Sequence, residues 1–310
     1  MSKTQASAMP QTDSHAKADL VLLLVTLLAA AGWIFSKEAL NGLAPLLFIG
    51  IRFSSAGLLL LVGNGRQLFS KLNKTQFKKS LATAFVMAGA LLCWIHGLDQ
   101  GKHMATGAFI TSLGILLVPL LSWAIFSNKI PRATWISIPV AISGLALLSL
   151  QSGISADPGQ LWYLAAAILF ALHFTLISHL ASGISASVLT GIQLLVVGIS
   201  AISVSAFIEP WPISIENEIV GWLLASILLA TSLRFTLQTY GQSLAPASHA
   251  ALIMILEPVW TALAAAFWFS ETMTWSQFFG CTLIFSALIV SRWHWVARLL
   301  QSLNRLRSIN

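Results

Sequence analysis

Ionisable side chains inside long apolar stretches are the residues of this chain most able to do chemistry. Arg52, Arg234 and Glu257 lie well inside such stretches, whereas Lys37 and Glu38 lie near the end of the first one. A charge near the centre of a bilayer costs roughly 2.5–3.5 kcal/mol on insertion scales, so it usually faces a partner or a cavity. The chemistry to expect is therefore the binding and movement of a polar solute or a proton within a membrane.

Glu257 is followed directly by Pro258 in the middle of an apolar stretch. Proline lacks the backbone donor and clashes with the carbonyl four residues earlier, here that of Met254. A carboxylate and a freed carbonyl would then lie side by side, as the lining of a solute or proton pathway requires. The alternative is that Glu257 pairs with Arg234 or an amide and only holds helices together. Either role predicts that neutralising Glu257 is damaging.

The two intramembrane arginines also allow more than one interpretation. Arg52 can bind an anionic group of a substrate through its planar guanidinium, or it can form a salt bridge to Glu257 or bond to freed carbonyls. Arg234 lies closer to one end of its stretch, where its side chain can reach the interface. The excess of Arg52, Arg234 and Lys37 over buried acids favours a substrate that carries a carboxylate.

Other polar and aromatic side chains are candidates for the same pathway, each with a plain structural alternative. Lys37 is either a gate residue or part of a solvated face beside Glu38. Lone histidines are more often hydrogen-bonded core groups than ligands, and no spacing indicates a metal site. Tryptophans on spanning helices commonly pack or face lipid. The candidates are Trp33, Lys37, Arg52, Trp94, His96, His173, Gln193, Arg234, Gln238, Tyr240, Glu257, Pro258 and Trp260, with Gln100, Phe174 and Gln242 as further members.

The composition indicates a membrane protein and argues against several other classes. Hydrophobic residues make up 57% of the 310 residues and charged residues only 9%, whereas a soluble protein averages about 25% charged. The net charge of +7 lies in short segments between apolar stretches, which indicates membrane topology rather than nucleic-acid binding. We find no phosphate-binding glycine loop and no cluster of nucleophile, base or metal ligands, so we expect neither an enzyme nor a cofactor.

A helix needs roughly 20 apolar residues to cross a bilayer, and ten stretches approach this length. A polar connection around Asp157 separates five of them from the other five. We expect an all-α membrane protein with a tail over 1–18, five-helix repeats over 19–150 and 159–292, and a basic tail over 293–310. The ten stretches are Leu20–Ala39, Ala44–Val62, Leu81–Leu98, Met104–Phe126, Ala133–Leu150, Gly159–Leu180, Ser187–Phe207, Ile219–Tyr240, Ala245–Phe269 and Trp275–Val290.

Basic residues fall on one side of the membrane if these helices alternate in direction. They include Lys78 and Lys79 before the third helix, and Arg298 and Arg305 after the tenth. The positive-inside rule then places both termini in the cytoplasm. Because each half has an odd number of helices, the second half enters from the opposite side, which predicts an inverted-topology repeat. Such proteins usually bind their substrate between the repeats near the middle of the bilayer.

Short segments of the chain recur about half its length apart. Gly50-Ile51-Arg52 matches Gly191-Ile192-Gln193 at an offset of 141, and Phe126-Ser127-Asn128 matches Phe269-Ser270-Glu271 at an offset of 143. The nearly equal offsets indicate a duplication. The two copies differ where chemistry is expected, because Arg52 aligns with Gln193 and Glu257 aligns with a glycine.

The chain resembles the drug/metabolite transporter superfamily, and within it the EamA-type ten-helix permeases, over about residues 19–292. The acidic turn Phe269-Ser270-Glu271 is the most specific of the motifs, because family members commonly end the ninth helix in a similar turn. The corresponding turn of the first half, Ser127-Asn128-Lys129, lacks the acid. The motifs that carry the resemblance are Gly32-Trp33 with Lys37, Pro45, Arg52-Phe53, Ala108–Leu113, Ala250–Ile253, Leu256–Val259 and the acidic turn Phe269-Ser270-Glu271.

The resemblance implies a permease of the bacterial inner membrane, often an exporter of amino acids or related metabolites. We therefore expect a secondary transporter that binds a small molecule and works in the lipid bilayer. If transport is coupled to protons, Glu257 is the first candidate for the coupling group. The alternative within transport is a permease for drugs or nucleotide-like solutes, and the alternative outside it is a non-transporting membrane scaffold.

Overall fold

The protein is described here by a computed structural model that covers residues 11–64, 73–100, 104–149, 158–268 and 274–291, and these residues form helices and their connections. The acidic turn at 269–271, the connection over 150–157 and the tail over 293–310 lie outside the described residues. The N-terminal helices are α1 (Gln11–Ala39), α2 (Pro45–Gly63), α4 (Lys74–Gln100), α5 (Met104–Phe126) and α6 (Arg132–Ser149). The later elements are α7 (Pro158–Leu180), the 3-10 turn η1 (Ala181–Gly183), α8 (Ala186–Ile208), α9 (Asn217–Ala225), the π-helix η2 (Ser226–Leu233), α10 (Arg234–Leu244), α11 (Ala247–Met254), α12 (Glu257–Trp268) and α13 (Trp275–Ser291).

Within the described residues, six helical stretches are long and apolar enough to cross a membrane: 16–39, 45–63, 74–94, 159–180, 186–208 and 217–244. Two shorter apolar helices cover 110–126 and 132–147. Large apolar side chains such as Phe207 and Phe267 are almost fully exposed on the outside of the bundle, as contact with lipid requires. A helix lies in each of the ten predicted stretches, and the crossing of all ten stays a prediction.

Two of the predicted stretches contain an irregularity that hydropathy does not reveal. The stretch over 217–244 is continuous, but its middle turns are the π-helix η2 between α9 and α10. The stretch over 245–269 is interrupted by a turn at Ile255 and Leu256, which separates α11 from α12. Both irregularities lie beside the charged residues described below.

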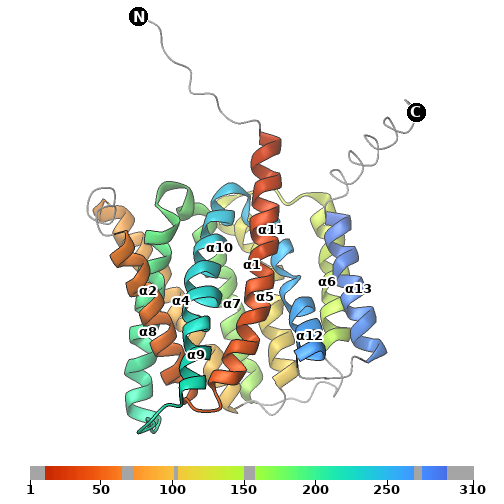
Figure 1. Cartoon of the computed structure of the whole chain (residues 1–310). Coiled ribbons are helices and arrows are strands. Elements are labelled where there is room, and N and C mark those ends of the chain that lie inside the picture. The colour runs from red at the N-terminus through yellow and green to blue at the C-terminus, as the bar shows by residue number, and fades with distance from the viewer. Residues whose placement is uncertain (1–10, 65–72, 101–103, 150–157, 269–273, 292–310) are drawn as a thin grey trace, which may run out of the picture.

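The helices α2 and α8 form the most extensive contact among the described elements and lie side by side along one edge of the bundle (Figure 1). Two pairs of glycines, each seven residues apart, lie where these helices touch: Gly50 with Gly57, and Gly191 with Gly198. A Cβ atom at Gly57 would lie 2.5 Å from the backbone nitrogen of Leu195. The absence of side chains therefore lets the two backbones approach, as in other membrane helix pairs.

Polar groups close this helix pair at both ends. Glu209, after the end of α8, accepts hydrogen bonds from the backbone N–H groups of Leu46 and Leu47, both at 2.9 Å. These donors belong to the first turn of α2, which has no intrahelical partners and favours a negative charge. At the other end the Ser187 hydroxyl donates to the Asn64 side chain at 3.0 Å. The start of α2 is thus contacted by the residue that follows α8, and the start of α8 is contacted by the residue that follows α2.

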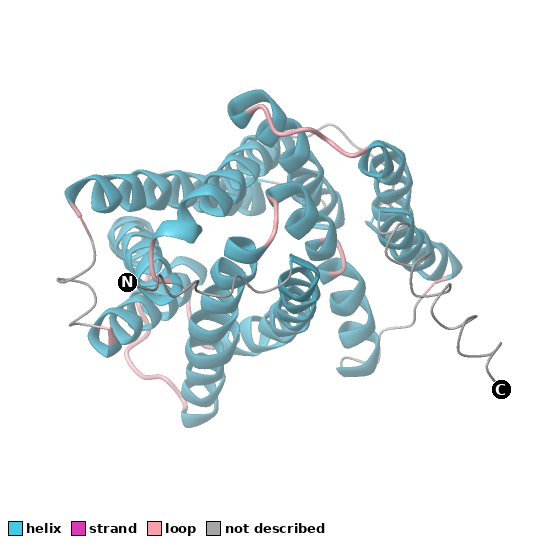
Figure 2. Ribbon diagram, turned by 90° about the horizontal axis from the view of Figure 1, so that it is seen from above, coloured by secondary structure: helices cyan, strands magenta, loops and turns pink. Residues whose placement is uncertain are grey.

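Elsewhere in the bundle, α7 and α1 each pack against two other helical segments. The helix α4 packs against α7, and α1 packs against the rod formed by α9, η2 and α10. In the same way α5 packs against α7, and α1 packs against α11 and α12. The helices α6 and α13 pack on each other at one side of the bundle, as both views show (Figures 1 and 2).

The glycine contact between α2 and α8 predicts the effect of a single methyl group. A Cβ at Gly198 would lie 2.2 Å from the backbone nitrogen of Ser54, so Gly198→Ala must push the helices apart. We expect it to destabilise the protein by roughly 1–3 kcal/mol, as overpacking does, and to lower the unfolding temperature in detergent.

Gly221→Ala on α9 is the matched control, because nothing lies within 4 Å of its Cβ position. Alanine is the better helix former, so this variant should unfold at the same temperature or slightly higher. Equal unfolding temperatures for the two variants would contradict the proposed close contact.

Candidate charged site between the helices

The π-helix η2 provides the backbone around which the charged residues gather. In a π-helix the hydrogen bonds run between residues five apart, and such segments occur frequently at functional sites. The Thr231 hydroxyl follows the same spacing, because it donates to the Ser226 carbonyl at 2.8 Å. This segment presents Ala230 and Thr231 to the facing helices α1 and α2.

Arg52 on α2 uses all three of its guanidinium nitrogens to join three elements. Its Nε donates to the Thr231 hydroxyl, its Nη1 donates to the Ser36 hydroxyl at 2.9 Å, and its Nη2 donates to the Ala230 carbonyl at 3.2 Å. Its Cζ atom also lies 5.6 Å from the ring centroids of both Phe48 and Phe53, a distance typical of cation–π contact. The three bonds of this partly buried guanidinium thus go to hydroxyl and carbonyl oxygens and to no carboxylate.

Gly32 on α1 allows this arrangement. Its Cβ position lies 2.8 Å from the Cβ of Ala230 and 3.5 Å from Nη2 of Arg52. A side chain here would separate α1 from η2 and disturb the Ala230 carbonyl that receives the arginine. The small residues before Gly32, Ala29 to Ala31, fit the close helix approach that such clusters allow.

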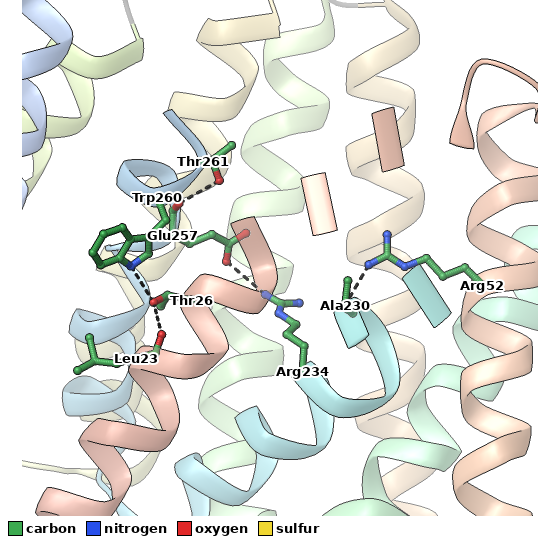
Figure 3. Close-up of polar contacts among 8 residues, drawn as sticks. All are labelled: Leu23, Thr26, Arg52, Ala230, Arg234, Glu257, Trp260 and Thr261. Atoms are coloured by element: carbon green, nitrogen blue, oxygen red, sulfur yellow. Dashed lines mark hydrogen bonds and ion pairs between the residues drawn. The ribbon is translucent and has the colours of Figure 1, made fainter. Parts of the chain in front are cut away.

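Arg234 and Glu257 form an ion pair between α10 and α12, with Nη2 of the arginine 3.2 Å from Oε2 of the glutamate. Figure 3 shows the two side chains extended toward each other. They are only 16% and 23% exposed, and the Arg234 Cζ lies 4.3 Å from the Phe235 ring centroid. The structure thus contains the ion pair between Glu257 and Arg234 that one interpretation of the sequence predicts. A role of Glu257 in transport stays a prediction.

The break between α11 and α12 explains how Glu257 reaches this position. Pro258 lies in the first turn of α12, where its missing N–H leaves no hydrogen bond unmade. Glu257 is the first residue of that helix, where the helix dipole favours a carboxylate. The Trp260 indole then donates to the Thr26 hydroxyl at 3.1 Å and joins α12 to α1 (Figure 3).

We name Arg52, Arg234 and Glu257, with the Ser36, Ala230 and Thr231 groups that bind Arg52, the arginine cluster. Its charged groups come from α2, α10 and α12. Arg52 extends toward Ala230 on η2, and Arg234, the residue that follows η2, extends toward Glu257 (Figure 3). Both guanidinium groups carry a positive charge, and Glu257 is the acid that pairs with one of them. The cluster can therefore attract an anionic group and hold it away from bulk water.

A second, uncharged polar group lies at the position that the duplication relates to Arg52. The Gln193 amide on α8 donates to the Thr83 hydroxyl on α4 at 3.1 Å, and Gln193 also lies beside His173 on α7. All three side chains are buried, and the His173 Nε2 atom has no hydrogen-bond partner among the described residues. The chain thus has one charged and one neutral polar site at related positions.

The remaining predicted pathway residues make none of the contacts that define the arginine cluster, and their surroundings differ. Gln238 is buried with its side-chain oxygen unpartnered among the described residues, and the Tyr240 ring lies 5.3 Å from the Lys17 ammonium. Trp33 and Lys37 are exposed, while Trp94 packs against the apolar core around α2. The exposed His96 lies 3.1 Å from the Leu92 carbonyl and 5.3 Å from the Trp162 ring.

Sequence reasoning missed two polar contacts that join distant helices. His249 at the start of α11 lies 2.6 Å from Asp19 on α1, and Glu209 caps α2 as described above. Asp19 comes immediately before the first apolar stretch, and an acid in that position is the signal that could have indicated a partner. The partner itself lies 230 residues away and has no local signature.

Comparisons with known proteins agree with this architecture. The sequence model of the EamA-like transporter family matches residues 16–150 and again residues 157–293. The chain belongs to the EamA-like transporter family. This assignment confirms the resemblance seen in the sequence, and it makes the protein a multi-pass membrane transporter.

Individual relatives of this EamA-like transporter extend over most of its length. A protein of Archaeoglobus fulgidus described as an uncharacterized transporter is 28% identical over 273 residues, which are 88% of this chain and 85% of that protein. A crystal structure described only as that of a protein has a TM-score of 0.76 at 17% identity, over 89% of this chain and 98% of the other. The structural likeness supports the fold alone.

The ion pair between Arg234 and Glu257 predicts strong coupling between two substitutions. Arg234→Gln leaves a carboxylate without its partner in a partly buried position, and Glu257→Gln leaves a guanidinium, so each should destabilise the protein. The double variant removes both charges and should lose less than the sum, with a coupling of roughly 1–2 kcal/mol in apparent unfolding free energy. Thermal unfolding of the four proteins in detergent measures this value. Strictly additive effects would show that the pair contributes nothing to stability.

Proposed function

We propose that this EamA-like transporter is a secondary active transporter that exports a small metabolite, such as an amino acid, by alternating access. The observation that carries the proposal is the arginine cluster, in which two arginines and a glutamate lie partly buried among α1, α2, η2, α10 and α12. Ionisable side chains in such positions are costly and generally serve a solute or ion pathway. The aromatic rings of Phe48, Phe53 and Phe235 beside the guanidiniums fit a metabolite with an apolar portion.

The proposal includes two inverted five-helix repeats, over 19–150 and 159–292. If each of the ten stretches is replaced by its counterpart in the other half, the contact of α4 with α7 becomes the contact of the rod containing α10 with α1. The contacts of α2 with α8 and of α6 with α13 are unchanged by the same exchange, because each joins two counterparts. The glycine pairs that join α2 and α8 are related by the same offset of 141 residues. A two-fold axis in the membrane plane would produce this pattern.

We further propose that the protein lies in the bacterial inner membrane with both termini in the cytoplasm. The basic residues between the second and third helices, and after the tenth, support this orientation through the positive-inside rule. The beginning of α1 and the end of α13 lie on the same face of the bundle (Figure 1), as an even number of crossings requires.

A metabolite comparison followed by counterflow tests the transport proposal. Metabolites released by cells that overexpress the protein, compared with those of control cells, identify the solute. Proteoliposomes that contain the protein and are loaded with that solute should then accumulate its radiolabelled form. Proteoliposomes prepared from cells with the empty vector should not. A preparation that is folded by gel filtration but gives no counterflow with any released solute would favour a scaffold over a transporter.

Glu257 is the proposed coupling group if transport uses the proton gradient. Glu257→Gln should reduce gradient-driven transport at least about tenfold. The glutamine amide has nearly the same shape as the carboxylate, but it cannot bind and release a proton. Glu218→Gln, an exposed acid on α9, is the matched control and should transport normally. Transport that survives collapse of the proton gradient would contradict the coupling, and normal transport by Glu257→Gln would contradict the role of this residue.

A further inference from the structure

The charges of the arginine cluster do not balance. Arg52 and Arg234 contribute two positive charges and Glu257 contributes one negative charge, which leaves a net charge of +1 between the helices. The three oxygens that accept hydrogen bonds from Arg52 belong to hydroxyl and carbonyl groups, which carry no compensating charge. A guanidinium has five N–H donors, so two remain for a further acceptor. An uncompensated charge in a low-dielectric position is expensive, so a counter-charge that enters the cluster is strongly favoured.

Unused hydrogen-bond donors accompany this excess charge. The Nε of Arg234 is buried and has no hydrogen-bond partner among the described residues. The hydroxyls of Ser226 and Ser232, both on η2, are likewise buried and unpartnered there. Buried donors are almost always satisfied in native proteins, so the unpartnered Nε of Arg234 indicates a place where an acceptor binds.

We infer that the arginine cluster is a binding site for a single carboxylate group of the transported metabolite, held between Arg52 and Arg234 beside the π-helix η2. This inference rests on the proposed function, since it identifies which chemical group of the solute the transporter recognises. A guanidinium matches a carboxylate well because its planar fork can donate two parallel hydrogen bonds.

The charge sum distinguishes a carboxylate from the other common anion, a phosphate. One carboxylate brings the cluster from +1 to neutrality while the Arg234–Glu257 ion pair stays in place. A phosphate dianion would bring it to −1 and would add a negative group close to Glu257. The site therefore selects a monoanion, and the carboxylate of Glu257 acts as the element that rejects a second negative charge.

Binding of simple probes to the purified full-length protein tests the site even while the metabolite is unidentified. Benzoate is the carboxylate probe and benzamide is its neutral counterpart of nearly the same shape. Inorganic phosphate, at a pH above its second pKa so that it is mainly the dianion, is the multiply charged probe. Benzoate should raise the unfolding temperature in detergent in a concentration-dependent way, because a ligand that binds the folded state stabilises it. Benzamide and phosphate should not. Equal shifts with benzamide, or a shift with phosphate alone, would overturn the inference.

Substitutions in the cluster locate the binding. Arg52→Gln and Arg234→Gln should each weaken benzoate affinity roughly tenfold or more, the loss expected for one charge-assisted contact. Arg132→Gln, an exposed arginine at the start of α6, should bind like the wild type. Undiminished benzoate binding in the Arg52→Gln/Arg234→Gln double variant would place the site elsewhere and refute the proposal.

Glu257→Gln gives a result that a misfolded protein cannot imitate. This substitution frees Nη2 of Arg234 and raises the cluster charge to +2, so benzoate should bind several-fold more tightly and phosphate should begin to bind. Transport should nevertheless fall, as proposed above. Weaker or unchanged benzoate binding in this variant would contradict the site.

The binding and transport experiments fail independently. Benzoate binding without counterflow would leave the site standing and remove the transport proposal, whereas counterflow of a neutral solute without benzoate binding would do the reverse.

Discussion

The hydrogen bonds of Arg52 are the interaction on which the middle of this bundle depends. One guanidinium from α2 binds the Ser36 hydroxyl of α1 and two oxygens of η2, so three elements that are distant in sequence share one set of donors. In a membrane these donors cannot be satisfied by water at low cost. These bonds tie α2 to η2 at Ala230 and Thr231, and Gly32 of α1 lies close to the same Ala230.

The glycine contact of α2 and α8 holds Arg52 where it can make those bonds. Lipid supplies little hydrophobic driving force between helices, so close backbone approach and polar end contacts must stabilise the pair. Glu209 caps the start of α2, and at the opposite end the Ser187 hydroxyl of α8 donates to the Asn64 side chain. The helix that carries Arg52 is thus anchored along its length before the charged residues are considered.

The departure from internal symmetry is as informative as the symmetry. Gln193, at the position related to Arg52, makes a neutral buried contact with Thr83, and the partner position of Glu257 is a glycine that packs against the Ala167 backbone. The first half of the chain therefore provides Arg52, and the second half provides Arg234, Glu257 and the π-helix. Two identical halves would carry the same charge at related positions, so the single glutamate and the unequal placement of the arginines are properties of this chain and not of the duplication.

The amino-acid sequence by itself determined the protein class, the approximate position of every described helix and the residues whose charges need partners, because hydropathy and charge are local properties of a chain in lipid. It left open whether Glu257 pairs with Arg234 and which carbonyls receive Arg52. Only the tertiary structure decided these points, since the partners lie 23 residues apart in one case and about 180 in the other. The π-helix, the cap from Glu209 and the Asp19–His249 contact are likewise consequences of packing between distant helices, and no periodicity within one helix records where its neighbour's oxygen atoms will lie.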